Sequence, residues 1–145
     1  MDREKAINYL KKVELAYFAT VEKKENVYAP RVRAMAIIQH DNQVWAVTVG
    51  GRAKITQLQE NNNFEFTTLI PEDNKNVALR ARGTADFIED MSTKEELSKA
   101  ISFFSGYWKS HDDPTFYLIK LNITQLVFQV PSEVVGKPAF YTIDL

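Results

Sequence analysis

Strand-like segments follow one another along this chain with only short polar turns between them, and this order limits the possible folds more than any other feature. Residues 15–22, 27–39 and 44–49 are separated by the turns KKEN and HDNQ. Residues 64–70 and 77–89 repeat the pattern on either side of PEDNKN. Because strands that arrive in runs pair most simply with antiparallel neighbours, the order favours an antiparallel barrel with peripheral helices over a doubly wound sheet.

Helical patterns flank and interrupt the strands. Asp2 can cap a first helix, and Ser92-Thr93 with Glu95 and Glu96 form a capping-box signature for a later one. The remaining elements are predicted as helices over residues 2–14, 52–60 and 93–104 and as strands over residues 116–123 and 125–130, with AFYTI near the end as one more strand. The sequence therefore predicts a mainly β fold of six or seven strands with three flanking helices.

The composition is that of an ordinary globular chain. With 145 residues the default is a single domain over residues 1–145, and 45% hydrophobic residues suffice for a core without disulfides or metals. Lysine and arginine total 18 against 19 acidic residues, so the net charge of -1 gives no bulk attraction to nucleic acid or an anionic membrane. No secretory signal or membrane-spanning run is evident, and we expect a cytoplasmic location.

Several kinds of chemistry lack their sequence signature. The chain has no cysteine, which excludes a thiol nucleophile, an iron–sulfur cluster and a thiolate zinc site. Neither G-x-G-x-x-G nor the P-loop pattern occurs, and no nucleophile elbow marks a serine hydrolase. The run His111-Asp112-Asp113 lies in an expected loop without further ligands, so we predict a solvated carboxylate loop and no metal site.

Two arginines stand two residues apart in the strand over residues 27–39. Side chains alternate across a strand, so Arg31 and Arg33 face the same way. If Val32 and Ala34 point into the barrel, both guanidinium groups point outward. Two adjacent guanidinium groups repel each other unless an anion or a carboxylate lies between them. The pattern is consistent with an anion site or with solvated arginines bridged to Glu or Asp.

A second group of basic residues follows the strand that ends near Thr48. Gly50-Gly51 allow the backbone to approach a ligand closely, and the helix that follows begins with N–H groups that lack partners. A phosphate placed there would collect these N–H groups together with Arg52 and Lys54. The alternative is a plain strand–turn–helix with solvated basic residues.

Several segments of the chain follow one another in a characteristic serial order: LAYFATV, PRVRAMAII, QVWAVT, Lys54 ahead of ITQLQENNNFEF, and ARGTADFI. This order resembles that of the pyridoxamine 5′-phosphate oxidase-like FMN-binding split-barrel superfamily. Within the superfamily the chain is most similar to the small general-stress and NimC/NimA-type proteins. The resemblance implies a six-to-seven-stranded antiparallel split β-barrel.

The resemblance also implies a cofactor and an assembly, namely a homodimer of split barrels with two FMN molecules at the subunit interface. Lys54 matches the superfamily's phosphate-binding lysine, and Arg52 would be a second phosphate contact. Thr48 would donate a hydrogen bond near the phosphate or the ribityl chain. Trp108 either reaches the partner's flavin or packs in the core or interface. The residues implied to line the flavin by their position are Arg33, Ala34, Met35 and Ala36.

These features predict an FMN-dependent oxidoreductase that acts on a small molecule. The flavin would carry the chemistry, so no acid–base side chain is required. Vitamin B6 oxidation is not expected, because Ala53 replaces a basic residue of the superfamily and the C-terminal tail lacks its arginine. The alternatives are a non-catalytic flavin or haem carrier or sensor, and an interaction module with an empty barrel. Arg80 and Arg82 are expected to pair with acidic residues across a sheet or dimer interface.

Overall fold

The computed structural model describes residues 1–50, 53–131 and 136–145 of the chain. In this part of the chain the regular elements are, in order, α1 (Arg3–Leu10), β1 (Leu15–Lys24), β2 (Val27–His40), β3 (Gln43–Val49), α2 (Ala53–Glu60), β4 (Asn63–Glu72), β5 (Lys75–Ile88), α3 (Met91–Ala100), the short 3₁₀ helix η1 (Phe104–Gly106), β6 (Phe116–Val130) and β7 (Ala139–Asp144). No helix described here combines the length and the apolar character that crossing a membrane requires.

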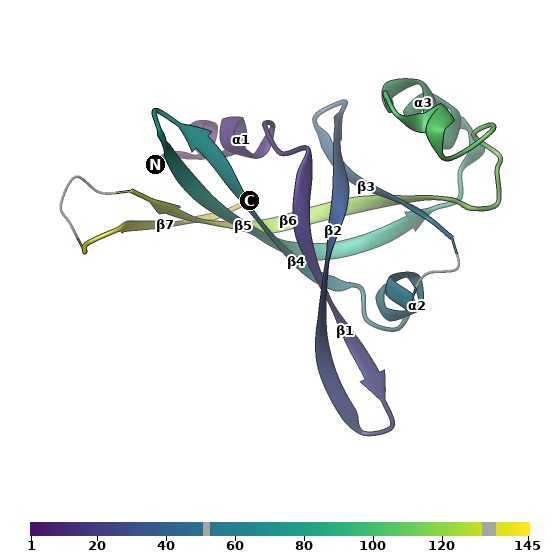
Figure 1. The fold of residues 1–145 in the computed structure, drawn as a ribbon, viewed down its shortest axis with the longest axis horizontal. Helices are drawn as coiled ribbons and strands as arrows, with labels where there is room; N and C mark the ends of the chain where they lie inside the picture. Colours follow the sequence, from purple (N-terminus) through teal and green to yellow (C-terminus); the bar gives the residue numbers. More distant parts are fainter. Residues whose placement is uncertain (51–52, 132–135) are drawn as a thin grey trace.

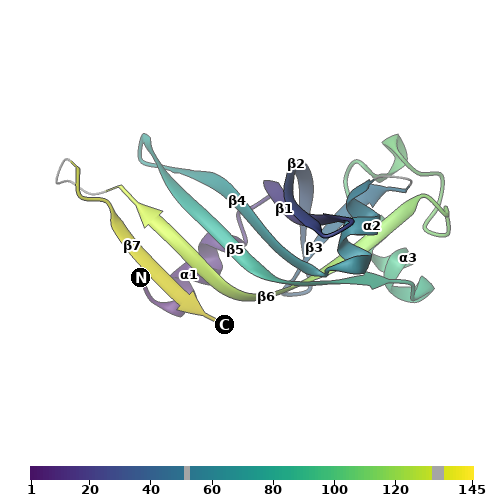
Figure 2. The same ribbon diagram turned by 90° about the horizontal axis from the view of Figure 1, so that it is seen from below.

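In the described part of the chain, seven strands form one antiparallel sheet in the order β3-β2-β1-β4-β5-β6-β7. β3 also pairs with β6, for example at Val47 and Leu118, so the sheet curls round into a ring. Residues 116–121 of β6 pair with β3, whereas residues 125–130 pair with β7 along the same edge. Figures 1 and 2 show the twisted ring and β7 extending away from it. The predicted mainly β fold is confirmed, and the divided edge of β6 is consistent with a split barrel.

One continuous strand replaces the two late strands that were predicted. The expected break fell at Thr124, but β6 runs through it. The register between β5 and β6 shifts between Arg82 and Gly83, which leaves Thr124 as the extra residue of a β-bulge. A Cβ at Gly83 would lie 1.8 Å from the carbonyl oxygen of Asn122, so only glycine fits opposite the bulge. The irregularity in the sequence at Thr124 therefore marks a bulge that bends β6, and the strand continues beyond it.

The third helix begins and ends earlier than predicted. Its cap is Asp90, whose carboxylate accepts a hydrogen bond from the Thr93 N–H at 2.9 Å, so the predicted cap at Ser92-Thr93 was wrong. The helix ends at Ala100 because Ile101 takes an extended backbone and buries its side chain. The predicted continuation to residue 104 is instead a change of direction into η1.

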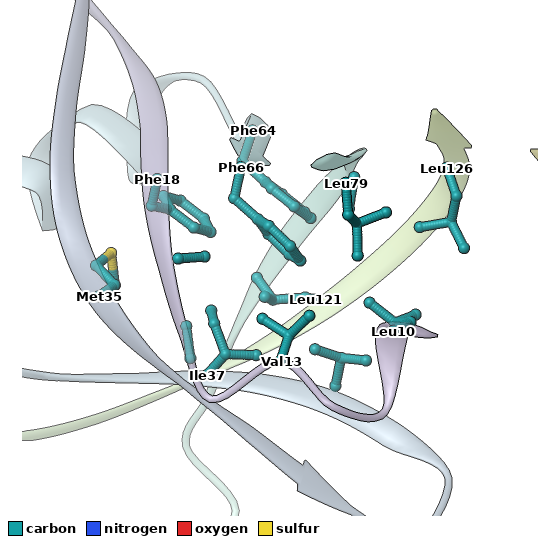
Figure 3. Packing of buried hydrophobic residues seen from close by; sticks show 14 of the residues in the cluster. Leu10, Val13, Phe18, Met35, Ile37, Phe64, Phe66, Leu79, Leu121 and Leu126 are labelled. Carbon is teal, nitrogen blue, oxygen red and sulfur yellow. The ribbon is translucent and has the colours of Figure 1, made fainter. Parts of the chain in front are cut away.

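The main core lies inside the ring, between the curved sheet and α1 (Figure 3). Phe18 stacks on Phe64 with ring centroids 5.0 Å apart, and Phe66 lies 6.2 Å from Phe64. α1, capped by Asp2 as predicted, packs Leu10 against this core. Burial of each phenylalanine contributes about 1.5–3 kcal/mol, so these rings are a large part of what holds the ring of strands together.

A second, smaller cluster lies on the other face of the β3–β6 pair, beneath α3. Trp108 and Phe116 are its centre, with ring centroids 4.8 Å apart. Its buried members are Trp45, Val47, Leu97, Ile101, Trp108, Phe116 and Leu118. Because β3 and the first half of β6 are covered on both faces, their backbone is the most enclosed part of the sheet.

Candidate cofactor site

A cavity of about 350 Å³ lies where β2, the end of β3, α2 and the segment after α3 come together. This volume is within the range of small-molecule sites, roughly 300–1,000 Å³. The structure brings most of the sequence-predicted cofactor residues to this cavity: Ala34, Met35, Ala36, Thr48, Lys54 and Trp108. The other lining residues are Val47, Val49, Phe103 and Tyr107.

The strand wall of the cavity combines small side chains with one hydroxyl group. Ala36 of β2 pairs with Val47 of β3, so the two strands present one continuous surface. Thr48 is 6% exposed, and its hydroxyl has no hydrogen bond to another described residue. Because no fully buried side-chain oxygen or nitrogen in the described residues lacks a partner, the Thr48 hydroxyl is not fully enclosed, and Thr48 is one of the residues that line the cavity. It is a polar group available to a ligand.

Gly50 lies at the end of this strand wall and connects it to the segment that enters β6. The N–H of Gly50 donates to the Thr115 carbonyl at 2.8 Å. A Cβ at Gly50 would lie 2.6 Å from the Tyr117 ring, so a larger residue would require that ring to move. The expectation that Gly50-Gly51 let the backbone approach a ligand stays a prediction, because Gly51 lies outside the described residues.

An aromatic wall faces the strands across the cavity. Phe103 and Tyr107 are 36% and 64% exposed, but Trp108 is only 4% exposed. The Trp108 indole N–H donates to the Thr115 carbonyl at 3.1 Å, and its ring packs on Phe116. The sequence left two roles open for Trp108. The structure shows that it packs in the second cluster and also lines the cavity.

Arg33 does not line the cavity, and the orientation considered for its strand is wrong. Val32 is 66% exposed, so Arg33 points to the opposite side, toward α2. Its guanidinium donates to Thr20 Oγ1 at 2.8 Å, Gln57 Oε1 at 2.9 Å and the Phe18 carbonyl at 3.2 Å. Burial lowers the pKa of Arg33, yet arginine stays protonated at neutral pH. Across the described residues, no carboxylate oxygen lies within 4.0 Å of this guanidinium.

Gln57 connects Arg33 to the helix that carries Lys54. It lies three residues after Lys54 on α2, so the two side chains share one face of the helix. Gln57 is 5% exposed and accepts a second hydrogen bond from Thr20 Oγ1 at 2.5 Å. Its Nε2 donates to Glu22 Oε2 at 3.2 Å. The sequence analysis gave Gln57 no role, although its spacing from Lys54 was a usable signal.

The other strand arginines are paired with carboxylates. Arg31 and Glu22 form an exposed ion pair at 3.0 Å, so for Arg31 the bridged alternative is the correct one. Glu65 lies 3.8 Å from Arg80 and 3.6 Å from Arg82. The prediction that Arg80 and Arg82 pair with an acidic residue across the sheet is confirmed.

The carboxylates of the acidic loop before β6 accept hydrogen bonds from groups nearby in the same segment. Asp113 accepts hydrogen bonds from the Thr115 N–H at 2.9 Å and the Thr115 hydroxyl at 2.8 Å, which lower the pKa of Asp113. A hydrogen bond from the Ser110 hydroxyl lowers the pKa of Asp112 in the same way. Within the described ranges, no three His, Asp or Glu side chains are grouped so that they could hold a metal ion.

The family model described as pyridoxamine 5′-phosphate oxidase matches residues 3–129. The chain belongs to this family. The match covers every element of the ring and all the described residues of the cavity. No curated protein matches the chain in sequence.

Solved structures resemble this family member at low sequence identity. A NimC/NimA family protein from Clostridium acetobutylicum is 18% identical, with a TM-score of 0.69 over 97% of this chain and 92% of that chain. General Stress Protein 26 from Bacillus anthracis str. Sterne is 19% identical, with a TM-score of 0.68 over 99% and 100%. A heme binding protein from Mycobacterium smegmatis is 13% identical, with a TM-score of 0.71 over 96% and 57%. At these identities the likeness shows the fold alone.

Two residues of the predicted phosphate site, Gly51 and Arg52, lie outside the described residues. Ala53, which the sequence analysis noted where the resemblance implies a basic residue, is exposed at the start of α2. Of the predicted basic contacts on this helix, the structure therefore places Lys54 at the cavity, and the contact of Arg52 stays a prediction.

Proposed function

We propose that this family member binds FMN in the cavity and acts as an FMN-dependent oxidoreductase on a small molecule. The observation that carries the proposal is that Thr48, Lys54 and Trp108 meet the small-residue wall of β2 at one cavity. A cofactor with a phosphate and a flat ring needs a cation, hydrogen-bond donors and apolar walls that approach each other closely. These residues supply each of those requirements.

In this proposal, the polar residues bind the phosphate end of the cofactor. The Lys54 ammonium supplies a charge-assisted hydrogen bond, and the Thr48 hydroxyl supplies a neutral one. Arg33 does not line the cavity itself, but Gln57 holds its guanidinium one turn along α2 from Lys54, so in this proposal Arg33 adds a second positive charge beside the phosphate end. The absence of a carboxylate within 4.0 Å of Arg33, among the described residues, supports a role in anion binding.

The apolar residues orient the ring and limit the access of water. Ala34 and Ala36 let a flat ring lie close to β2, and Trp108 supplies the opposite wall. When bound, the flavin supplies the transfer of hydride or electrons between a donor and the small-molecule substrate. The chain therefore needs no acid–base side chain of its own at the cavity.

The outer face of the sheet supports a homodimer with the cofactor at the subunit interface. Leu15 is opposite Ala36 and Tyr17 is opposite Ala34, so the apolar face continues directly from the cavity wall. Leu15, Tyr17 and Val32 are 52%, 54% and 66% exposed. An exposed apolar patch of this kind marks an interaction surface, and a second copy placed on it would complete the cavity from outside.

The alternative proposal is a non-catalytic flavin or haem carrier or sensor of the same fold. The heme binding protein among the similar structures is the observation that favours it. Against haem, His40 Nε2 donates a hydrogen bond to Glu96 Oε1 at 2.8 Å, and His40 does not line the cavity.

The absorption spectrum of freshly purified protein, with mass identification of the released chromophore, tests these proposals. We expect a yellow protein that releases FMN and consumes NADH or NADPH with a suitable acceptor. A yellow protein that never turns over would favour the carrier. A colourless protein that FMN does not stabilise would contradict both, since a specific ligand at a hundredfold excess over Kd stabilises by about 2.7 kcal/mol.

A further inference from the structure

Arg33 is a partly buried cation whose side-chain hydrogen bonds to the described residues all go to uncharged oxygens. The acceptors are Thr20 Oγ1, Gln57 Oε1 and the carbonyls of Phe18 and Arg31. Charged groups that lose contact with water are usually paired with an opposite charge, because burial of an unpaired charge is costly. A carboxylate is nearby, but it is engaged elsewhere: Glu22 pairs with Arg31 at 3.0 Å.

Gln57 separates that carboxylate from Arg33. Three contacts connect these residues in a row. Arg31 Nη2 lies 3.0 Å from Glu22 Oε1, Gln57 Nε2 donates to Glu22 Oε2 at 3.2 Å, and Arg33 Nη2 donates to Gln57 Oε1 at 2.9 Å. The amide is fixed in direction because its Nε2 donates to Glu22, which leaves Oε1 for Arg33 and Thr20. Gln57 is 5% exposed, so water does not compete for these contacts.

We propose that Gln57 is a positioning residue that holds the Arg33 guanidinium toward α2 without neutralising it, and so makes the site selective for a phosphorylated ligand. An amide oxygen accepts from a guanidinium but leaves its full charge available to an anion. A carboxylate in the same place would form an ion pair and compete with the phosphate. The inference rests on the proposed function, because it concerns the same site.

The position of Gln57 on α2 gives this selectivity a rigid basis. Lys54 and Gln57 are one turn apart on the same helix, so the helix fixes the cavity lysine and the support of Arg33 together. The hydrogen bond to Thr20, which is 2% exposed, ties this face of α2 to β1. The Arg33 guanidinium is therefore held in place before a ligand binds, which reduces the entropy that binding must overcome.

The test is the substitution Gln57→Glu, read as the ratio of the Kd values for riboflavin and FMN. Riboflavin lacks the phosphate, so it reports the ring site alone. We expect FMN to bind about 10- to 100-fold more weakly, the equivalent of one charge-assisted hydrogen bond, and riboflavin to change less than about twofold. Gln59→Glu, an exposed change on the same helix, is the matched control and should alter neither affinity by more than about twofold.

A second variant protects the test against misfolding. Gln57→Glu places a carboxylate beside Glu22, so the double variant Glu22→Gln/Gln57→Glu moves the negative charge from position 22 to position 57 and keeps the net charge. It should show the same loss of FMN affinity in a folded protein. An unchanged ratio of riboflavin to FMN affinity in the double variant would overturn the inference.

Inorganic phosphate separates the failure of this inference from the failure of the flavin proposal. If the natural chain binds neither flavin, the flavin proposal fails, and thermal stabilisation by phosphate then decides the role of Gln57. Stabilisation of the natural chain and of Gln59→Glu, but not of the double variant, would support the inference for another phosphorylated ligand. Equal stabilisation of all three proteins, or of none, would overturn it.

Discussion

The two hydrophobic clusters share the strands β3 and β6 but differ in what surrounds them. The main core, with Phe18, Phe64 and Phe66, is enclosed by the ring of strands and by α1. The second cluster, with Trp108 and Phe116, has α3 on one side and the cavity on another. The comparison indicates that one cluster maintains the fold, whereas the other holds the wall of the binding site.

The clusters also differ in the kind of chain that supplies their aromatic rings. The three phenylalanines of the main core stand on regular strands, where alternation fixes their direction. Trp108 lies in the irregular segment between η1 and β6, where its indole N–H donates to the Thr115 carbonyl and its ring packs on Phe104 and Phe116. Its position therefore depends on tertiary contacts, and substitutions there should affect binding more directly than stability.

The largest expected effect is on the main core. Phe66→Ala should lower the free energy of unfolding by about 3–5 kcal/mol, because it removes a fully enclosed ring and leaves a cavity. FMN affinity of the remaining folded protein should change little, since Phe66 does not line the site. Urea denaturation and a flavin titration at low temperature measure the two effects, and a large loss of affinity would break the distinction between the clusters.

The second largest effect is expected on FMN binding, from a substitution at the cavity. Lys54→Ala should weaken FMN binding by about 1.5–3 kcal/mol, the range for a charge-assisted hydrogen bond. Lys99→Ala, which removes a lysine with a 75% exposed side chain from α3, is the control and should leave the affinity unchanged. An unchanged titration of Lys54→Ala by flavin fluorescence would remove Lys54 from the site.

Two tryptophan substitutions separate the contribution of the second cluster to stability from its contribution to FMN binding. Trp108→Phe loses the hydrogen bond to Thr115, and Trp45→Phe loses the hydrogen bond from its indole N–H to the His40 carbonyl at 3.3 Å. Each change should cost about 0.5–1.5 kcal/mol of stability. FMN affinity should fall only for Trp108→Phe, because Trp45 does not line the cavity. Equal flavin titrations would show that the aromatic wall plays no part in binding.

The smallest effect concerns pH at the edge of the main core. The Tyr9 hydroxyl donates to Glu72 Oε2 at 2.6 Å, and burial together with this carboxylate raises the pKa of Tyr9 to about 12. Below pH 10 both folded and unfolded states keep the proton, so stability is fully retained. Between pH 10 and about 12 the unfolded state loses its proton first, and stability should fall. Thermal melts should show this decline, with a smaller slope in Tyr9→Phe.

Much of the fold could be predicted because its signals are local. Strand-like alternation and polar turns located β1 to β5, and Asp41 and Asn42 in the first predicted hairpin turn take the left-handed conformation that suits such residues. The errors lie where long-range contacts decide. The bulge at Thr124 keeps β6 continuous because β5 pairs with it on both sides of the irregular residue.

The candidate site was predictable in part for the same reason. Lys54 and Thr48 could be located because a strand end followed by a helix is a local pattern. The direction of the Arg33 side chain could not be predicted. The alternation of side chains along a strand places Arg31 and Arg33 on the same side, but it does not determine which side faces α2. The polar contacts of Gln57 with Thr20 and Arg33 join segments more than twenty residues apart, and no local pattern announces them.

The sequence by itself determined where β1 to β5 lie along the chain, the turns between them, the family and the residue types available for a phosphate. These follow from periodicity, turn chemistry and serial order, which are properties of neighbouring residues. Only the tertiary structure decided that Trp108 is both core and cavity wall and that Gln57 separates Arg33 from a carboxylate. The physical reason is that closure of the sheet between β3 and β6, with α2 against β1, brings distant side chains to distances at which they can pair.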